Sequence, residues 1–153
     1  MWLPDSGLIS EVTRFLRPSV ETTLTIPSTA QRLISVGAYD GYTDRMAPFS
    51  GRGYTLQNLI KPDLVAPGVN VESTVPGGGY GFKSGTSMAV PFVSGSAALM
   101  MEWGIVKGND PFLYGEKIKA YLQRGARHLL GFTEYPNPQT GYGALCVRKS
   151  LPK

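Results

Sequence analysis

The sequence predicts an α/β domain with a mostly parallel sheet. Two short apolar runs, residues 32–39 and 64–66, are closed by turn residues, a pattern typical of buried parallel strands. A long run of small and apolar residues predicts a helix over 87–103, and a second helix is predicted to end near residue 123. Strands that alternate with helices in this way favour the α/β class.

Composition narrows the class of protein further. The chain has 153 residues, which is enough for one domain or part of one, and 42% of them are hydrophobic. Its 19 glycines and 12 prolines indicate many shaped loops. The formal net charge is +4, but the Lys and Arg residues are scattered along the chain. We therefore expect a solvated basic surface and no nucleic-acid partner.

The first 25 residues differ from the rest of the chain. Trp2-Leu3-Pro4 and the hydroxyl-rich run 19–25 predict an extended segment or linker that leads into the domain at residue 26. The start lacks the basic region and apolar run of a signal peptide.

Turns and a further strand are expected between the two buried strands and the first helix. Residues 47–53 predict a turn, and residues 69–75 alternate valine with polar residues, which predicts a half-buried strand. The three glycines at 77–79 predict a loop where a backbone or a substrate can approach closely. The phosphate-binding pattern Gly-x-x-x-x-Gly-Lys-Ser/Thr is absent.

The first predicted helix lacks a clean polar face, so we expect it to be buried on most sides. Pro91 falls in or just after its first turn, where a missing N–H costs little. Gly95 lies in a row of small residues, 94–98, and is expected to mark the closest approach to another element. The uncharged run before Glu102 is glycine-broken and serine-rich. It therefore predicts a core helix and no membrane partner.

The second predicted helix has a clear start signal. Asn109-Asp110-Pro111 offers a cap and a first-turn proline. Tyr114, Ile118 and the pair 121–122 then recur at helical spacing, which predicts a stripe that packs on the core.

Ser87 is the candidate catalytic residue. It follows Gly85-Thr86 and opens the first predicted helix, so free N–H groups and the positive end of the helix dipole point toward it. Such a serine suits nucleophilic attack, because fixed donors stabilise negative charge on a reacting oxygen nearby. For a lone Gly-Thr-Ser the alternative is an N-capping hydroxyl with only a structural role.

Several motifs resemble those of the subtilisin-like serine proteases, the subtilases. They are Gly85-Thr86-Ser87-Met88-Ala89 with Pro91 and Val93, Lys61-Pro62-Asp63-Leu64-Val65-Ala66-Pro67-Gly68, Ile34-Ser35-Val36-Gly37-Ala38 followed by Ala47-Pro48-Phe49-Ser50-Gly51, and Thr140-Gly141-Tyr142-Gly143. The resemblance covers roughly residues 26–147. It implies that residues 26–153 are the C-terminal part of a three-layer, subtilisin-like α/β catalytic domain. Phe92 stands where most of the family has a non-catalytic His, a change that bears on packing.

The resemblance also implies a function. Ser87 would be the nucleophile of a serine endopeptidase that cleaves peptide or protein substrates. The family's Asp and His precede the serine, and nothing in this sequence matches their motifs. The Asn of the oxyanion hole should lie before residue 26, yet no Asn precedes Asn58. We therefore expect a chain that is inactive alone, with the missing N-terminal part of the catalytic domain as its partner. A non-catalytic regulatory or binding protein related to the subtilases is the alternative.

Residues 1–25 resemble a segment found in one clostridial branch of the subtilases that is linked to spore germination. There an inserted β-rich domain returns to the protease domain at about this place. This resemblance implies an extracellular or spore-associated bacterial protein. Calcium is common in the family, but no Asp/Asn-rich loop here marks a site, and no other cofactor is evident.

His128 is the single histidine and the only internal alternative for a catalytic base. Arg124 and Arg127 flank it, and no carboxylate before Glu134 is placed to orient it. We therefore expect a structural role for His128.

The remaining candidate residues carry weaker signals. Asp40 and Asp63 have no metal-ligating neighbour at useful spacing, and Asp63 lies in a motif whose role in the family is structural. Cys146 is the single cysteine, which excludes an internal disulfide and a cysteine-based metal site. Between Leu145 and Val147 it is expected to be a small buried hydrophobe.

Overall fold

The computed structural model describes residues 6–10 and 12–151. In chain order it contains a 3-10 turn (Ser6–Leu8), strands β1 (Val36–Asp40), β2 (Arg45–Met46), β3 (Leu64–Pro67), β4 (Val71–Thr74) and β5 (Tyr80–Lys83), helix α1 (Thr86–Met101) continued by a π-helical turn (Glu102–Val106), and helices α2 (Gly115–Arg124) and α3 (Val147–Ser150). The expectation for Trp2-Leu3-Pro4 lies outside the described residues.

Strands β1 and β3 form the parallel pair at the centre of the molecule. Their register runs from Val36 opposite Leu64 to Tyr39 opposite Pro67. Strand β2 pairs with the other edge of β1 in the antiparallel sense. The two predicted buried parallel strands are thus confirmed, although β1 begins at Val36 and not at residue 32. Residues 31–35 are not in the strand, because lysine side chains bind the backbone oxygens of Gln31 and Leu33.

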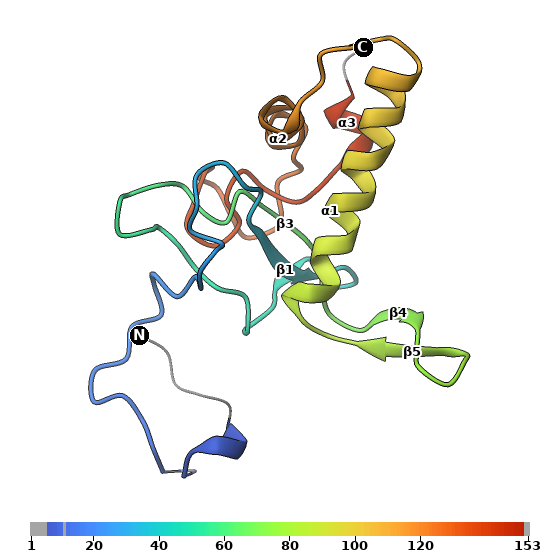
Figure 1. The fold of residues 1–153 in the computed structure, drawn as a ribbon. Coiled ribbons are helices and arrows are strands. Elements are labelled where there is room, and N and C mark those ends of the chain that lie inside the picture. The colour runs from blue at the N-terminus through green and yellow to red at the C-terminus, as the bar shows by residue number, and fades with distance from the viewer. Residues whose placement is uncertain (1–5, 11, 152–153) are drawn as a thin grey trace.

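Strands β4 and β5 form a separate antiparallel hairpin that projects from the body of the molecule (Figure 1). The predicted glycine loop lies at its tip, where residues 77–79 all have positive φ angles. The strand predicted over 69–75 is observed as β4. It is more exposed than expected, because Glu72, Ser73 and Thr74 all face solvent.

Helix α1 packs on the central strands through one face. Its buried residues are Ala89, Val93, Ser96 and Met100, and the three apolar ones belong to the core with residues of β1 and β3. The expectation of burial on most sides is wrong for this chain, because no described element covers the opposite face. Large apolar side chains outside the packed face are therefore exposed, namely Val90, Phe92, Leu99, Met101, Ile105 and Val106.

The expectation for Gly95 is also wrong for this chain. Gly95 is exposed, and a Cβ added to it would meet no atom within 4 Å. It lies on the uncovered side of α1, so it marks no close approach to another described element.

Residues Thr86–Val106 form a continuous helical segment of 21 residues whose most apolar window has a mean hydropathy of 1.4. By length and composition alone, this segment is sufficient to cross a membrane, and 28% of that window is buried. The buried positions pack on β1 and β3. The assignment as a core helix and the absence of a membrane partner remain predictions.

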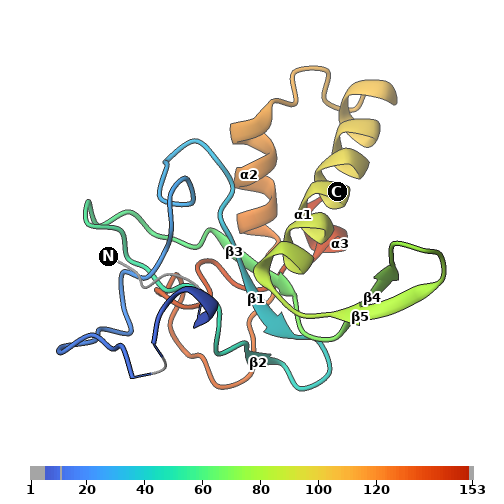
Figure 2. The ribbon, with the colours of Figure 1, turned by 60° about the horizontal axis from the view of Figure 1, so that its bottom comes forward.

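Helix α2 confirms the second predicted helix but begins at Gly115, not near Pro111. Residues 109–113 form a turn, because the carboxylate of Asp110 accepts hydrogen bonds from Lys117 (2.7 Å) and the Tyr121 hydroxyl (3.3 Å). Ile118 and Leu122 are buried as the stripe predicted, whereas Tyr114 is exposed at the helix start. Helices α1 and α2 lie on the same side of β1 and β3 (Figure 2).

The C-terminal segment completes the central sheet. The amide of Leu145 donates to the Val65 carbonyl (2.8 Å), and Ala144 pairs with Arg127 on its other side. Arg127 also forms a two-point ion pair with Asp44, at 2.7 and 2.8 Å. This bond holds the pKa of the Asp44 carboxyl below its ordinary value. The pair therefore ties the turn after β1 to the last third of the chain.

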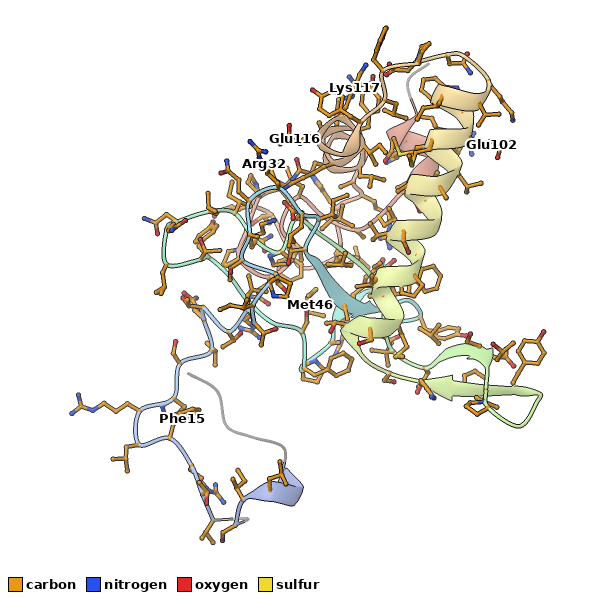
Figure 3. The ribbon with its side chains drawn as sticks, in the orientation of Figure 1. Phe15, Arg32, Met46, Glu102, Glu116 and Lys117 are labelled. Atoms are coloured by element: carbon orange, nitrogen blue, oxygen red, sulfur yellow. The ribbon has the colours of Figure 1, made fainter. Side chains whose placement is uncertain are left out.

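The N-terminal segment carries little regular structure. After the turn at Ser6–Leu8, no further helix or strand occurs before β1 within the described residues. Phe15 lies far from the body of the molecule (Figure 3). The segment joins the body at Thr23, whose hydroxyl accepts a hydrogen bond from the Arg52 amide (2.9 Å).

Gly68, immediately after β3, lies at the closest contact between the sheet and α1. A Cβ added to Gly68 would lie 2.6 Å from the Cβ of Ala38, 2.9 Å from the Gly85 carbonyl oxygen and 3.4 Å from the Cβ of Ala89. Only a residue without a side chain leaves room for these three neighbours.

The exposed apolar face of α1 predicts self-association of the isolated chain. Patches of this kind are rare on soluble monomers and favour association. Size-exclusion chromatography with light scattering at low micromolar concentration should show dimers or larger species. A monomer with a sharp thermal transition would contradict this expectation.

The contact at Gly68 predicts that Gly68→Ala destabilises the chain by about 1–3 kcal/mol through overpacking. Gly41→Ala is the matched control at the same end of the sheet, since its added Cβ would meet only Pro67, at an ordinary 3.5 Å. Thermal unfolding of both variants at equal protein concentration measures the difference. Equal melting temperatures would show that the sheet and helix are not packed this closely.

Candidate active site

Ser87 lies in the first turn of α1, where β5 and a short connection lead into the helix (Figures 1 and 2). Its side chain is exposed. Residue Gly85 occupies the N-cap position, and no side chain caps the helix. The structural alternative, in which Ser87 serves as a capping hydroxyl, is therefore not what the structure contains.

Gly85 has a backbone conformation (φ +155°, ψ +159°) that residues with a side chain rarely adopt. Its amide donates to the Gly68 carbonyl (2.8 Å), which attaches the helix start to the end of β3. Its carbonyl accepts from the Met88 amide (3.0 Å). Among the described residues, the Ser87 amide has no acceptor. This N–H is therefore free to donate to a group outside the chain.

A second hydrogen bond fixes the segment between β5 and α1. The amide of Asn70 donates to the Ser84 hydroxyl oxygen (2.9 Å), which closes the base of the β4–β5 hairpin. Together with the bond between Gly85 and Gly68, this contact holds both chains of the hairpin base against the end of β3.

A cavity of about 270 Å³ opens beside Ser87. One side of it is formed by the start of α1 and the other by the irregular segment before β1. The lining residues are Pro27, Ser28, Leu33, Ile34, Ser35, Val36, Thr86, Ser87 and Val90. A smaller adjoining hollow of about 200 Å³ shares Ser28, Ser35, Val36 and Thr86. Both are sized for part of a chain or a side chain, not for a large ligand.

Next to the segment before β1 lies the buried carboxylate of Asp63, which accepts three hydrogen bonds and forms a further ion pair with Lys119. One oxygen accepts from Lys61 Nζ (2.6 Å) and from the Ser35 amide (2.7 Å). The other lies 2.8 Å from Lys119 Nζ and 3.1 Å from the Gln123 amide nitrogen. Burial lowers the pKa of Lys61, and the bond to Asp63 opposes that shift. This network joins the segment before β1, the start of β3 and helix α2. The structural role that the resemblance implies for Asp63 remains a prediction.

Sequence reasoning did not identify Lys119 and Gln123 as members of this network. Their spacing of four residues places them on one face of α2. This spacing can be read from the sequence, but it does not indicate that both side chains contact Asp63, which lies 60 residues before Gln123.

His128 is not placed to act on Ser87. Its ring is stacked on Tyr135, with centroids 4.0 Å apart and planes within 5°. In the part of the chain that the structure describes, no hydrogen bond joins His128 to Ser87 or to a carboxylate.

The other candidates also have local roles. The Asp40 carboxylate accepts from the Tyr42 amide and the Thr43 hydroxyl, which lower its pKa and stabilise the turn after β1. Cys146 is half-buried next to α3 and less enclosed than expected. Across residues 6–10 and 12–151, no three His, Cys, Asp or Glu side chains gather as a metal site requires.

The comparisons with known proteins agree on one family. A family model described as "Subtilase family" matches residues 17–144. Pyrolysin of Pyrococcus furiosus is 40% identical over 119 residues, which are 73% of this chain and 8% of pyrolysin. The serine protease AprX of Bacillus subtilis is 33% identical over 150 residues, covering 85% of this chain and 32% of AprX.

Solved structures show the same relationship. The CspB protease of Clostridium perfringens is 55% identical and superposes with a TM-score of 0.86, over 90% of this chain and 29% of CspB. The self-cleaved protease domain of PatA is 28% identical, with a TM-score of 0.68 over 85% of this chain and 44% of that domain. The chain thus spans less than half the length of each of these relatives.

Proposed function

The chain belongs to the subtilase family, and on that premise we propose that it supplies the nucleophile of a serine endopeptidase, Ser87. The remaining catalytic groups are proposed to come from the part of a subtilase catalytic domain that these residues do not include. The polypeptide that joins both parts is called the complete domain below.

One observation carries the proposal. Ser87 is exposed at the start of a helix, its own amide has no acceptor within the described chain, and a cavity opens beside it. A nucleophile, a free donor and space for a substrate therefore lie at one place, as an acyl-transfer site requires.

The chemistry follows from that arrangement. In the complete domain a base takes the Ser87 hydroxyl proton while Oγ forms a bond to the scissile carbonyl carbon. The carbonyl π electrons move onto its oxygen, to which the Ser87 amide donates a hydrogen bond. The C–N bond then breaks, the amine leaves with the proton from the base, and water later hydrolyses the acyl-enzyme.

The base is proposed to lie outside this chain. His128 is the single histidine, and its ring is stacked on that of Tyr135. The relatives are two to more than ten times longer than the matched part, which leaves room for the Asp, the His and the oxyanion Asn. A regulatory or binding protein without peptidase activity is the second candidate, and the labelling experiment below separates the two.

The family membership also supports a proposal for the substrate, the partner and the bound ions. The proposed substrate is a peptide or protein, and the proposed partner is the other part of the catalytic domain. Calcium is common among subtilases, but no described cluster of residues here fits it, so we assign no ion to this chain.

The isolated chain should show no peptidase turnover above background. A serine without a base is a weak nucleophile at neutral pH. Incubation with a panel of fluorogenic peptides measures this directly, with Ser87→Ala as the control. Turnover that disappears in the Ser87→Ala variant would overturn the proposal that the base lies elsewhere.

In the complete domain, Ser87 should be the one residue of this chain that a fluorophosphonate probe labels. In subtilisin, loss of the nucleophile lowers kcat by about 10⁶-fold, and Ser87→Ala should have an effect of that order. Ser84→Ala is the matched control, since Ser84 lies three residues away and binds Asn70. Mass spectrometry identifies the labelled residue.

Two results would contradict this expectation. Labelling of Ser84 or Thr86 would show that this residue, and not Ser87, is the nucleophile. An unlabelled complete domain with intact Asp and His motifs would favour the regulatory alternative.

A further inference from the structure

We propose that Lys119, together with Lys61, is a positioning residue for the cavity beside Ser87. It acts by holding the wall formed by residues 31–35, without touching Ser87 itself. This inference rests on the proposed function, because it assigns a role in substrate binding to a network behind the same site.

Two of the three polar contacts of Lys119 are with this wall, and the third is with Asp63. Its ammonium lies within hydrogen-bond distance of the Gln31 carbonyl (2.9 Å), the Leu33 carbonyl (3.2 Å) and the Asp63 carboxylate (2.8 Å). The two carbonyls accept hydrogen bonds, and the contact with Asp63 is an ion pair. Lys119 thus connects helix α2 to two backbone oxygens of one short segment.

Lys61 and Asp63 hold the same segment from the other side. Lys61 Nζ donates to the Leu33 carbonyl (3.0 Å), and Asp63 accepts from the Ser35 amide (2.7 Å). The Leu33 carbonyl therefore has two lysine donors. Side chains thus satisfy the Leu33 carbonyl, whereas the Ser35 carbonyl accepts from the backbone amide of Asp63 (2.8 Å).

The held segment is a wall of the cavity. Leu33, Ile34 and Ser35 line it directly, opposite the start of α1. Segment 31–35 has no regular structure of its own. Backbone bonds from the amides of Asp63 and Leu64 hold its end at Ser35, so the lysine bonds determine mainly the position of residues 31–33. Loss of one lysine should let the wall shift relative to Ser87.

A further contact at the surface is weaker. Arg32 lies beside Glu116 of α2 in Figure 3, with Nε and Oε1 3.6 Å apart. Both side chains are largely exposed, and exposed pairs of this kind contribute little. The positioning role therefore falls to the buried lysines.

Lys119 is the better residue to test. Its side chain is 16% exposed, whereas that of Lys61 is 2% exposed and its removal would take the shorter of two ammonium contacts from a buried carboxylate. Lys117→Met is the matched control, because Lys117 lies on the same helix and binds Asp110, away from the wall.

The experiment compares Lys119→Met with wild type in the complete domain. We expect kcat/KM for a fluorogenic peptide to fall about ten- to hundredfold, because a small displacement of a substrate-positioning group can cause a loss of this size even when it is remote from the reacting atoms. The change should lie in KM, with kcat nearly unchanged, because binding and not the chemical step is affected. Hydrogen exchange at amides 31–36 should become faster. The labelling rate with a small fluorophosphonate, which does not fill the cavity, should stay near that of wild type.

Lys119→Arg should restore most of the lost affinity, since it keeps the charge and the donors. If Lys119→Met fails to fold, Lys119→Gln, which keeps an N–H donor without the charge, should show the same rise in KM to a smaller extent. Unchanged KM in a well-folded Lys119→Met or Lys119→Gln variant overturns the inference. Equal losses in Lys117→Met, or equal falls in kcat and labelling rate, overturn it as well. A wild-type domain that neither cleaves nor labels instead overturns the proposed function itself.

Discussion

The structure is organised around the buried carboxylate of Asp63. Four groups contact it from three regions of the chain: Ser35 before β1, Lys61 before β3, and Lys119 and Gln123 on α2. Removing one partner of a buried ion pair typically costs 3–5 kcal/mol, because the other charge is left without compensation. The network therefore holds α2 and the central strand pair in one arrangement.

The same strand leads from this network to the nucleophile. Strand β3 begins one residue after Asp63 and ends beside Gly68, whose carbonyl binds the amide of Gly85 at the start of α1. Rigid elements place a reactive side chain more reproducibly than loops do. The position of Ser87 thus depends on a short strand with a buried ion pair at one end and a close helix contact at the other.

Much of this arrangement could be predicted from local sequence. The buried strands, the glycine loop, the long helix and Ser87 at its start all follow from residue patterns over a few positions. The irregular backbone of residues 31–35 could not be predicted, because lysines at 61 and 119 satisfy its carbonyls from far along the chain. The start of α2 was misplaced for a similar reason, since the Asp110 side chain bonds to Lys117 and does not cap a helix at Pro111. The burial of α1 could not be predicted either. The lack of a polar face indicates that a helix can be buried, but it does not show whether the described chain contains elements that cover it.

The contact among Gly68, Ala38 and Ala89 has a consequence for how this sequence can evolve. The three positions share one small volume, and each already carries a residue of one carbon atom or none in its side chain. Glycine at position 38 or 89 would remove one of these contacts, but the backbone carbonyl oxygen of Gly85 at 2.9 Å would remain, so a compensating substitution at either position cannot by itself admit a larger residue at Gly68. Among homologues, position 68 should remain glycine even where the surrounding strands diverge, and residues 38 and 89 should vary only among the smallest side chains.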